Sequence, residues 1–209
     1  PSPPDRLAKR RLATLRAEMT RRELDAFVVL IDANRRYLSG YSAEDGQFDE
    51  TAGALLITAD AALLLTDSRY ELQAQEEAPD YAVSCYTKSL YAALPDVLHR
   101  ADARRVGFES VRLSVKHHRD LLERLQQSDP QVRLIPTENT VESLRAVKDA
   151  HEQALTRRAV QCAETAFRQL TDWMAPGMTE LAVARQLEAL MVAAGAESPS
   201  FPIIVAAGP

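Results

Sequence analysis

The pattern of apolar positions along the 209-residue chain changes near residue 136. Before that point, short unbroken apolar runs alternate with stretches in which apolar residues recur at helical spacing. After it, the helical spacing continues alone until residue 201. Unbroken short runs are typical of strands buried on both faces, whereas the helical spacing is typical of amphipathic helices. The pattern therefore predicts an α/β domain followed by a helical segment.

The first part contains enough strand signals for one sheet. The runs 54–57 and 62–65, separated by a turn at Asp60, predict a hairpin, and the other runs alternate with helices. The elements expected in order are helix 5–22, strand 27–31, a short helix capped by Asn34 and ended by Gly40, the hairpin, helix 70–77, strand 81–86, a helical stretch 90–99 interrupted at Pro95, strand 106–108, helix 115–127 and strand 132–135. A hairpin among alternating strands and helices predicts a mixed sheet flanked by helices.

The second part begins after the polar stretch 136–140, and we place the domains at 1–140 and 141–209. A long helical face extends to Pro176, and Thr179 caps a further helix. The apolar run Phe201–Ala206 has the character of a buried strand, which needs partners for its backbone N–H and C=O groups. Because the chain stops at Pro209, we expect this run to be disordered, swapped or paired with another chain.

Composition narrows the class of protein. A net charge of −5 argues against a nucleic-acid partner, and the acidic residues among the N-terminal arginines indicate a solvated helix face. No apolar segment approaches the roughly 20 residues that span a bilayer, and the N-terminus lacks the apolar core of a signal peptide. Cys85 and Cys162 are far apart, as expected for reduced thiols packed as small apolar residues. We expect a cytoplasmic protein without membrane contact.

The residues that usually carry catalysis do not form a recognisable set. His117 and His118 are adjacent, so on a helix their side chains diverge by roughly 100° and cannot chelate one ion; a solvated pair is the favoured interpretation. His151 and Glu152 meet the same objection, and His99 has no partner at a useful spacing. With neither a glycine-rich phosphate loop nor a nucleophile elbow, the sequence predicts no self-sufficient active site and no catalytic or metal-binding residue.

Two polar clusters stand out. The acidic loop Ser42–Glu50 is either a solvent-exposed loop, which we favour, or a site that attracts a cation or a substrate ammonium group. The segment Thr66–Tyr70 lies where a strand leads into a helix. There Asp67 or Ser68 caps the helix and Arg69 forms a structural ion pair, or the cluster has a direct functional role; the structural interpretation is favoured.

Taken together, five segments resemble the creatinase/prolidase/aminopeptidase P family. The segments are Asn34–Tyr41, Leu65–Tyr70, Arg145–Asp149 with Glu152, Pro176–Glu180, and Gly195–Gly208. They occur in the family's order over nearly the whole chain. The resemblance implies a creatinase N-terminal-like domain followed by the first helices and first strand of an incomplete α+β pita-bread metallopeptidase domain. The Ser42–Glu50 loop departs from the family's commoner short glycine-rich form.

The resemblance also implies the chemistry of the complete protein. In the family, two Asp, one His and two Glu hold two divalent metal ions, usually manganese or cobalt, and every one of these positions lies beyond Pro209. Phe201 falls where the family has an aromatic residue that lines the pocket beside the metals, and Ile204 falls on the same strand. We expect both to contact substrate, although either residue fits a core position equally well.

The function implied is that of the N-terminal portion of a metal-dependent Xaa-Pro aminopeptidase, which removes the N-terminal residue from peptides with proline in second position. The 209-residue chain alone is expected to be inactive, to form a homodimer and to shape the active-site entrance. The alternatives are a prolidase, a creatinase-type amidinohydrolase, or a non-catalytic oligomerisation or binding module.

Overall fold

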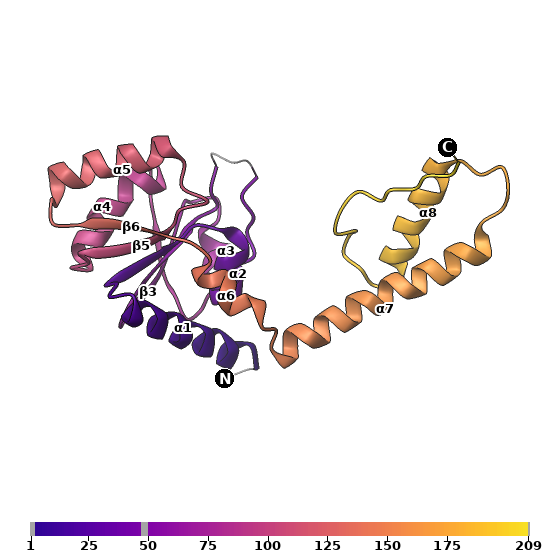
Figure 1. Ribbon diagram of the computed structural model, residues 1–209, viewed down its shortest axis with the longest axis horizontal. Helices are drawn as coiled ribbons and strands as arrows, with labels where there is room; N and C mark the ends of the chain where they lie inside the picture. Colours follow the sequence, from indigo (N-terminus) through magenta and orange to yellow (C-terminus); the bar gives the residue numbers. More distant parts are fainter. Residues whose placement is uncertain (1–2, 47–49, 209) are drawn as a thin grey trace. The chain divides into compact units, whose positions relative to one another are not determined.

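The short apolar runs of the sequence form one six-stranded sheet in the order β4-β3-β2-β1-β5-β6. The computed structural model describes residues 3–46 and 50–208 (Figure 1). The strands are β1 (Ala26–Val29), β2 (Ala54–Thr58), β3 (Ala62–Thr66), β4 (Ala82–Cys85), β5 (Arg105–Glu109) and β6 (Arg133–Thr137). Only β2 runs antiparallel to its neighbours, and it forms the expected hairpin with β3. The predicted mixed α/β sheet is therefore confirmed.

Helices cover both faces of the sheet. The helices of this part are α1 (Pro3–Arg21), α2 (Asp32–Ser39), α3 (Glu71–Glu77), α4 (Leu90–Arg100), α5 (Val115–Ser128) and α6 (Thr140–Ala146). Buried residues of α1, α2, α3 and α6 form one core on one face, and those of α4 and α5 form a second core on the other. Successive strand residues point to opposite faces, so Phe27 and Val29 enter the first core while Val28 enters the second. This double burial explains the unbroken apolar runs.

Local chemistry explains where several helices begin and end. Gly40 ends α2 with a φ of 87°, a left-handed conformation that glycine adopts at little cost. Asn34 does not cap this helix as expected: Ile31 is the N-cap, and Asn34 is buried in the first turn, where its side chain is engaged elsewhere. Pro95 lies inside α4 without ending it, contrary to the expected interruption.

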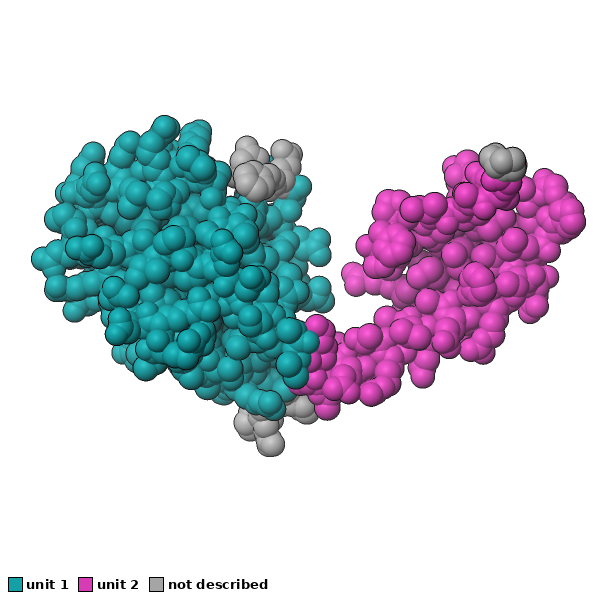
Figure 2. All heavy atoms as spheres, in the orientation of Figure 1, with its two compact units in different colours: residues 1–147 teal, residues 148–209 magenta. Residues whose placement is uncertain are grey.

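The chain divides into two compact units, residues 1–147 and 148–209 (Figure 2). The sequence placed the boundary between residues 140 and 141, and it missed α6 because the stretch before that helix is polar. Helix α6 packs against α1 and α2, and Val141 is completely buried in the first core. The seven residues of α6 therefore belong to the first unit by their packing.

The second unit is a pair of helices followed by an irregular tail. Helices α7 (Ala150–Trp173) and α8 (Glu180–Ala193) contact each other, with Cys162, Ala166 and Leu170 buried on the α7 side. A capping box of Asp149 and Glu152 begins α7, and Thr179 caps α8 as expected. Cys85 of the first unit is exposed, so the expected packing of both thiols holds only for Cys162.

Residues 201–208 form no strand, contrary to the strand expected over Phe201–Ala206. A strand needs a neighbour for its backbone groups, and none of the described strands pairs with this run.

Candidate functional site

Polar side chains gather at one edge of the sheet in the first unit. Strands β1, β3, β4, β5 and β6 all run in one direction, so their carboxyl ends meet at the same edge. Glu109 ends β5, and Asp67 directly follows β3. Ligands of open α/β sheets bind outside the carboxyl ends of the strands, where the strand order reverses. The chain leaves β4 at one side of the sheet and re-enters it at β5, beyond β1, which makes this edge the place to look for function.

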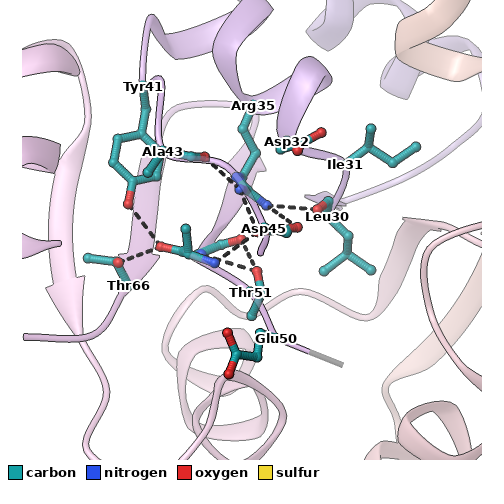
Figure 3. Close-up of polar contacts among 12 residues, drawn as sticks. Leu30, Ile31, Asp32, Arg35, Tyr41, Ala43, Asp45, Glu50, Thr51 and Thr66 are labelled. Carbon is teal, nitrogen blue, oxygen red and sulfur yellow. Dashed lines mark hydrogen bonds and ion pairs between the residues drawn. The ribbon is translucent and has the colours of Figure 1, made fainter. Parts of the chain in front are cut away.

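Among the described residues, the most buried ion pair at this edge joins Arg35 of α2 to Asp45 of the acidic loop (Figure 3). Two guanidinium nitrogens of Arg35 donate to the two carboxylate oxygens of Asp45, at 2.8 and 3.1 Å. The same nitrogens donate to the backbone carbonyls of Leu30 and Ala43. The exposed fractions of the two side chains are 0% for Arg35 and 5% for Asp45. Such a forked pair fixes orientation as well as charge.

Asp45 has further partners that hold the loop in place. Arg112 donates to its carboxylate at 3.2 Å, and the backbone N–H of Ala52 donates to it at 2.8 Å. Burial alone would raise the pKa of Asp45, but these hydrogen bonds and the arginine charges hold the pKa below its usual range. The carboxylate is therefore ionised and fully engaged by the chain's own groups.

This geometry corrects the favoured interpretation of the acidic loop. Glu44, Gly46 and Glu50 are exposed as expected, but Asp45 is an internal anchor and does not offer its charge to an external cation or ammonium group. Residues 47–49 of the loop lie outside the described residues.

A second polar network joins β5 to α2 and α6. One carboxylate oxygen of Glu109 accepts hydrogen bonds from the backbone N–H groups of Leu30 and Ile31, at 2.7 and 2.6 Å. The other accepts from the side-chain amide of Asn34 at 2.6 Å. Burial raises the pKa of Glu109 to about 7, because the loss of hydration outweighs these three hydrogen bonds.

Asn34 extends this network to α6. Its amide nitrogen also donates to Glu142 at 2.7 Å, and its oxygen accepts from the guanidinium group of Arg145 at 2.7 Å. A single buried side chain therefore connects a central strand with the last helix of the first unit.

The segment after β3 forms the expected ion pair. The guanidinium group of Arg69 donates twice to Asp67, at 2.9 and 3.1 Å, and the backbone N–H of Arg69 donates to the same carboxylate. Hydrogen bonding to Arg69 lowers the pKa of Asp67. Neither Asp67 nor Ser68 is the N-cap of α3, because that position belongs to Tyr70 and no side chain caps it.

The histidines are less solvated than expected. The ring of His117 stacks on Tyr91 with centroids 4.2 Å apart, and His118 lies 5.5 Å from Phe108, so the two rings diverge as the helix geometry requires. His99 has a partner that its sequence spacing did not reveal, Asp129 at 3.0 Å. Across residues 3–46 and 50–208, no three His, Cys, Asp or Glu side chains come close enough to hold a metal ion.

Phe201 and Ile204, the residues expected to contact substrate, belong to the second unit. Their exposed fractions are 68% and 86%, so neither side chain is part of the small core between α7 and α8. The polar edge described above belongs to the first unit.

Sequence reasoning missed the residues that dominate the polar edge. In the sequence Arg35 stands out only as part of the segment Asn34–Tyr41, and no motif marks Glu109 or Arg112. A charged residue directly after the buried run Val106–Phe108 is a signal that could have identified Glu109, since the end of a buried strand is a common place for function. No residue close to Arg112 in the sequence predicts which groups it contacts.

Comparison with known proteins places both parts of the chain. Residues 11–147 match the creatinase/prolidase N-terminal domain family, and residues 154–209 match metallopeptidase family M24. A curated relative, the uncharacterised peptidase YqhT of Bacillus subtilis, is 30% identical over 185 residues, which cover 88% of this chain and 49% of that protein. The chain thus spans about half the length of the curated relatives it matches.

Solved structures agree in fold. An Xaa-Pro dipeptidase from Bacillus anthracis is 27% identical with a TM-score of 0.81, and the match covers 93% of this chain and 51% of that one. An X-Pro aminopeptidase from Thermotoga maritima is also 27% identical, with a TM-score of 0.74, and covers 91% of this chain and 51% of that one. None of the described helices is both long and apolar enough to cross a membrane. By its fold and by the match over residues 11–147, the chain belongs to the creatinase/prolidase N-terminal domain family.

Proposed function

We propose that this chain is the N-terminal portion of a metal-dependent Xaa-Pro aminopeptidase, which hydrolyses the N-terminal residue from peptides with proline in second position. One observation carries the proposal: a creatinase/prolidase N-terminal unit is followed directly by a helix pair that matches metallopeptidase family M24. In this proposal the first unit serves oligomerisation, as a homodimer, and shapes the entrance to the active site. We expect the protein to be cytoplasmic and to bind neither nucleic acid nor membrane.

The metal ions of such an enzyme do not fit the described residues of this chain. Manganese and cobalt ions take several carboxylate or imidazole ligands that converge. Here Asp45 is neutralised by Arg35 and Arg112, and Glu109 is enclosed by backbone amides and Asn34. We therefore assign no ligand and no catalytic residue in this chain, and propose that other residues of the complete protein hold the two metals.

Phe201 and Ile204 are proposed to line the substrate pocket of the complete enzyme. Their exposure in the second unit supports this role over a core role, because a large apolar side chain that is mostly exposed in its own unit is available to contact another surface. Phe201 would supply an apolar wall without the hydroxyl group of a tyrosine.

Three alternatives are kept, each with its own observable. The likeness to a structure described as an Xaa-Pro dipeptidase favours a prolidase, which would act on Xaa-Pro dipeptides. A creatinase-type amidinohydrolase would act on creatine. A non-catalytic module would hydrolyse none of these substrates and would act through binding alone.

Three test substrates distinguish these possibilities. The protein encoded by the complete reading frame around this sequence is purified and assayed with manganese against an Xaa-Pro dipeptide, an Xaa-Pro-Yaa tripeptide and creatine. Cleavage of the tripeptide supports the aminopeptidase, and activity on the dipeptide or on creatine alone supports the corresponding alternative. Absence of all three activities, together with absence of the two Asp, one His and two Glu, would overturn the proposal. The 209-residue chain assayed alone is expected to show no hydrolysis.

A further inference from the structure

A cavity of about 320 Å³ lies at the carboxyl edge of the sheet in the first unit. It is lined by Asp67 after β3, Tyr86 after β4, Thr51 before β2, the first turn of α4 and one side of α5. Small-molecule sites occupy roughly 300–1,000 Å³, so this volume suits a small metabolite. The cavity lies outside the carboxyl ends of β3 and β4, at the same edge of the sheet as the carboxyl ends of the other parallel strands, and open α/β sheets bind ligands at that edge.

The charged groups of the cavity leave an excess of positive charge. Lys88 precedes α4, and Lys116 and Arg124 lie along α5; among the described residues none of the three forms an ion pair. One of the acidic lining residues is closely paired, because Asp67 is held by Arg69 at 2.9 Å. Asp120 lies 3.9 Å from Arg119, which also contacts Glu123. Lys88, Lys116 and Arg124 therefore exceed the carboxylates of Glu50 and Asp120 by one positive charge.

The other wall of the cavity adds a flat ring surface and backbone donors. The rings of Tyr91 and His117 stack with centroids 4.2 Å apart, and both residues line the cavity. The N–H groups in the first turn of α4 have no acceptor within their own helix. The hydroxyl oxygen of Ser89 accepts a hydrogen bond from one of them, the N–H of Ala92. Helix N-termini of this kind favour anions.

We propose that this cavity binds a small organic anion through a phosphate or carboxylate group. Lys88, Lys116 and Arg124 supply the charge, the amino end of α4 supplies N–H donors, and the Tyr91–His117 pair contacts the organic part. The site would be additional to the hydrolysis of peptides, and it does not depend on the proposed peptidase function.

The site is tested by titrating the 209-residue chain with pyrophosphate, and separately with citrate, at constant ionic strength. Binding is measured from the NMR chemical shifts of the backbone amides. The expected result is saturable shifts at Leu90, Tyr91 and His117. Lys116→Gln and Arg124→Gln should each weaken binding about tenfold, as for the loss of one charge-assisted hydrogen bond. Both side chains are exposed, so the variants should keep the fold. Tighter binding of pyrophosphate indicates a phosphate ligand, and tighter binding of citrate indicates a carboxylate.

Arg100→Gln is the matched control, because it removes the same charge at the opposite, exposed end of α4. It should leave both affinities unchanged. The proposal is overturned if neither anion gives saturable shifts, or if Arg100→Gln weakens binding as much as Arg124→Gln does.

Discussion

The carboxylate of Glu109 at the end of β5 accepts a 2.6 Å hydrogen bond from the side-chain amide of Asn34 in α2. Asn34 in turn contacts Glu142 and Arg145 of α6, so Glu109 is the inner end of a chain of polar contacts that reaches the last helix of the unit. Because burial raises the pKa of Glu109 to about 7, the protonation of this carboxyl group is coupled to the stability of the fold near neutral pH.

Glu109→Gln should therefore change the pH dependence of stability. The folded-state pKa of about 7 lies above the ordinary value of 4.5, so the folded state binds the proton more tightly and the stabilisation is lost as pH rises from 4.5 through 7. We expect the free energy of unfolding of the natural chain, relative to Glu109→Gln, to fall by about 3 kcal/mol between pH 5 and pH 8. Urea unfolding at both pH values measures it. An unchanged difference would show that Glu109 does not titrate in this range.

The pair of Arg35 and Asp45 should be more important for stability than its position in a polar loop implies. Arg35→Met leaves the buried carboxylate of Asp45 without its forked partner, and breaking a buried pair on one side costs about 3–5 kcal/mol. Arg36→Met, in the next position of the same helix, is the control because that side chain is exposed, and it should cost less than about 0.5 kcal/mol. The free energy of unfolding of both variants is measured with urea. Equal losses for Arg35→Met and Arg36→Met would contradict the stabilising role of the Arg35–Asp45 pair.

How much of this fold can be predicted from the sequence depends on how far apart the interacting residues are along the chain. The β2–β3 hairpin and an ion pair of Arg69 follow from neighbours along the chain, and both were predicted, although Asp67 was expected as a helix cap and not as the partner of Arg69. Glu109 and Asn34 are 75 residues apart, and Arg112 and Asp45 are 67 apart, so their contacts exist only once the sheet has formed. The strand expected at Phe201–Ala206 was wrong because apolar character indicates burial but does not supply a neighbouring strand.

Gly53, which leads into β2, should not tolerate a side chain. Its φ of 149° is rarely adopted by L residues, and a Cβ there would collide with the backbone oxygen of Leu65 on the paired strand. We expect Gly53→Ala to lower the free energy of unfolding by about 2 kcal/mol or more. Gly46→Ala is the control, since a Cβ there meets only a Glu50 oxygen at 3.8 Å. Thermal unfolding of both variants measures the contrast, and similar melting temperatures would argue against strain at Gly53.

Phe201 should affect catalysis without affecting the stability of this chain. Its exposed fraction of 68% means that Phe201→Ala removes little buried surface, so the free energy of unfolding should change by less than about 0.5 kcal/mol. In the complete enzyme the same substitution should lower kcat/KM for Xaa-Pro peptides, since the proposed apolar wall is lost. Leu170→Ala, at a buried position of α7, is the opposite control and should destabilise the second unit. Unchanged kcat/KM would remove Phe201 from the proposed pocket.

Truncation tests where the first unit ends. A fragment of residues 1–147 retains α6, with Val141 completely buried and the contacts of Glu142 and Arg145 to Asn34 intact, and should unfold cooperatively. A fragment of residues 1–139 loses the Val141 side chain, whose burial contributes roughly 1.5–3 kcal/mol, and leaves Asn34 buried without two of its partners. We therefore expect the shorter fragment to be less stable by at least about 3 kcal/mol in urea unfolding. Replacing Val141 by Ala in the longer fragment separates the two causes, because that variant loses apolar burial while Glu142 and Arg145 remain. Equal stability of the two fragments would place the end of the unit at β6.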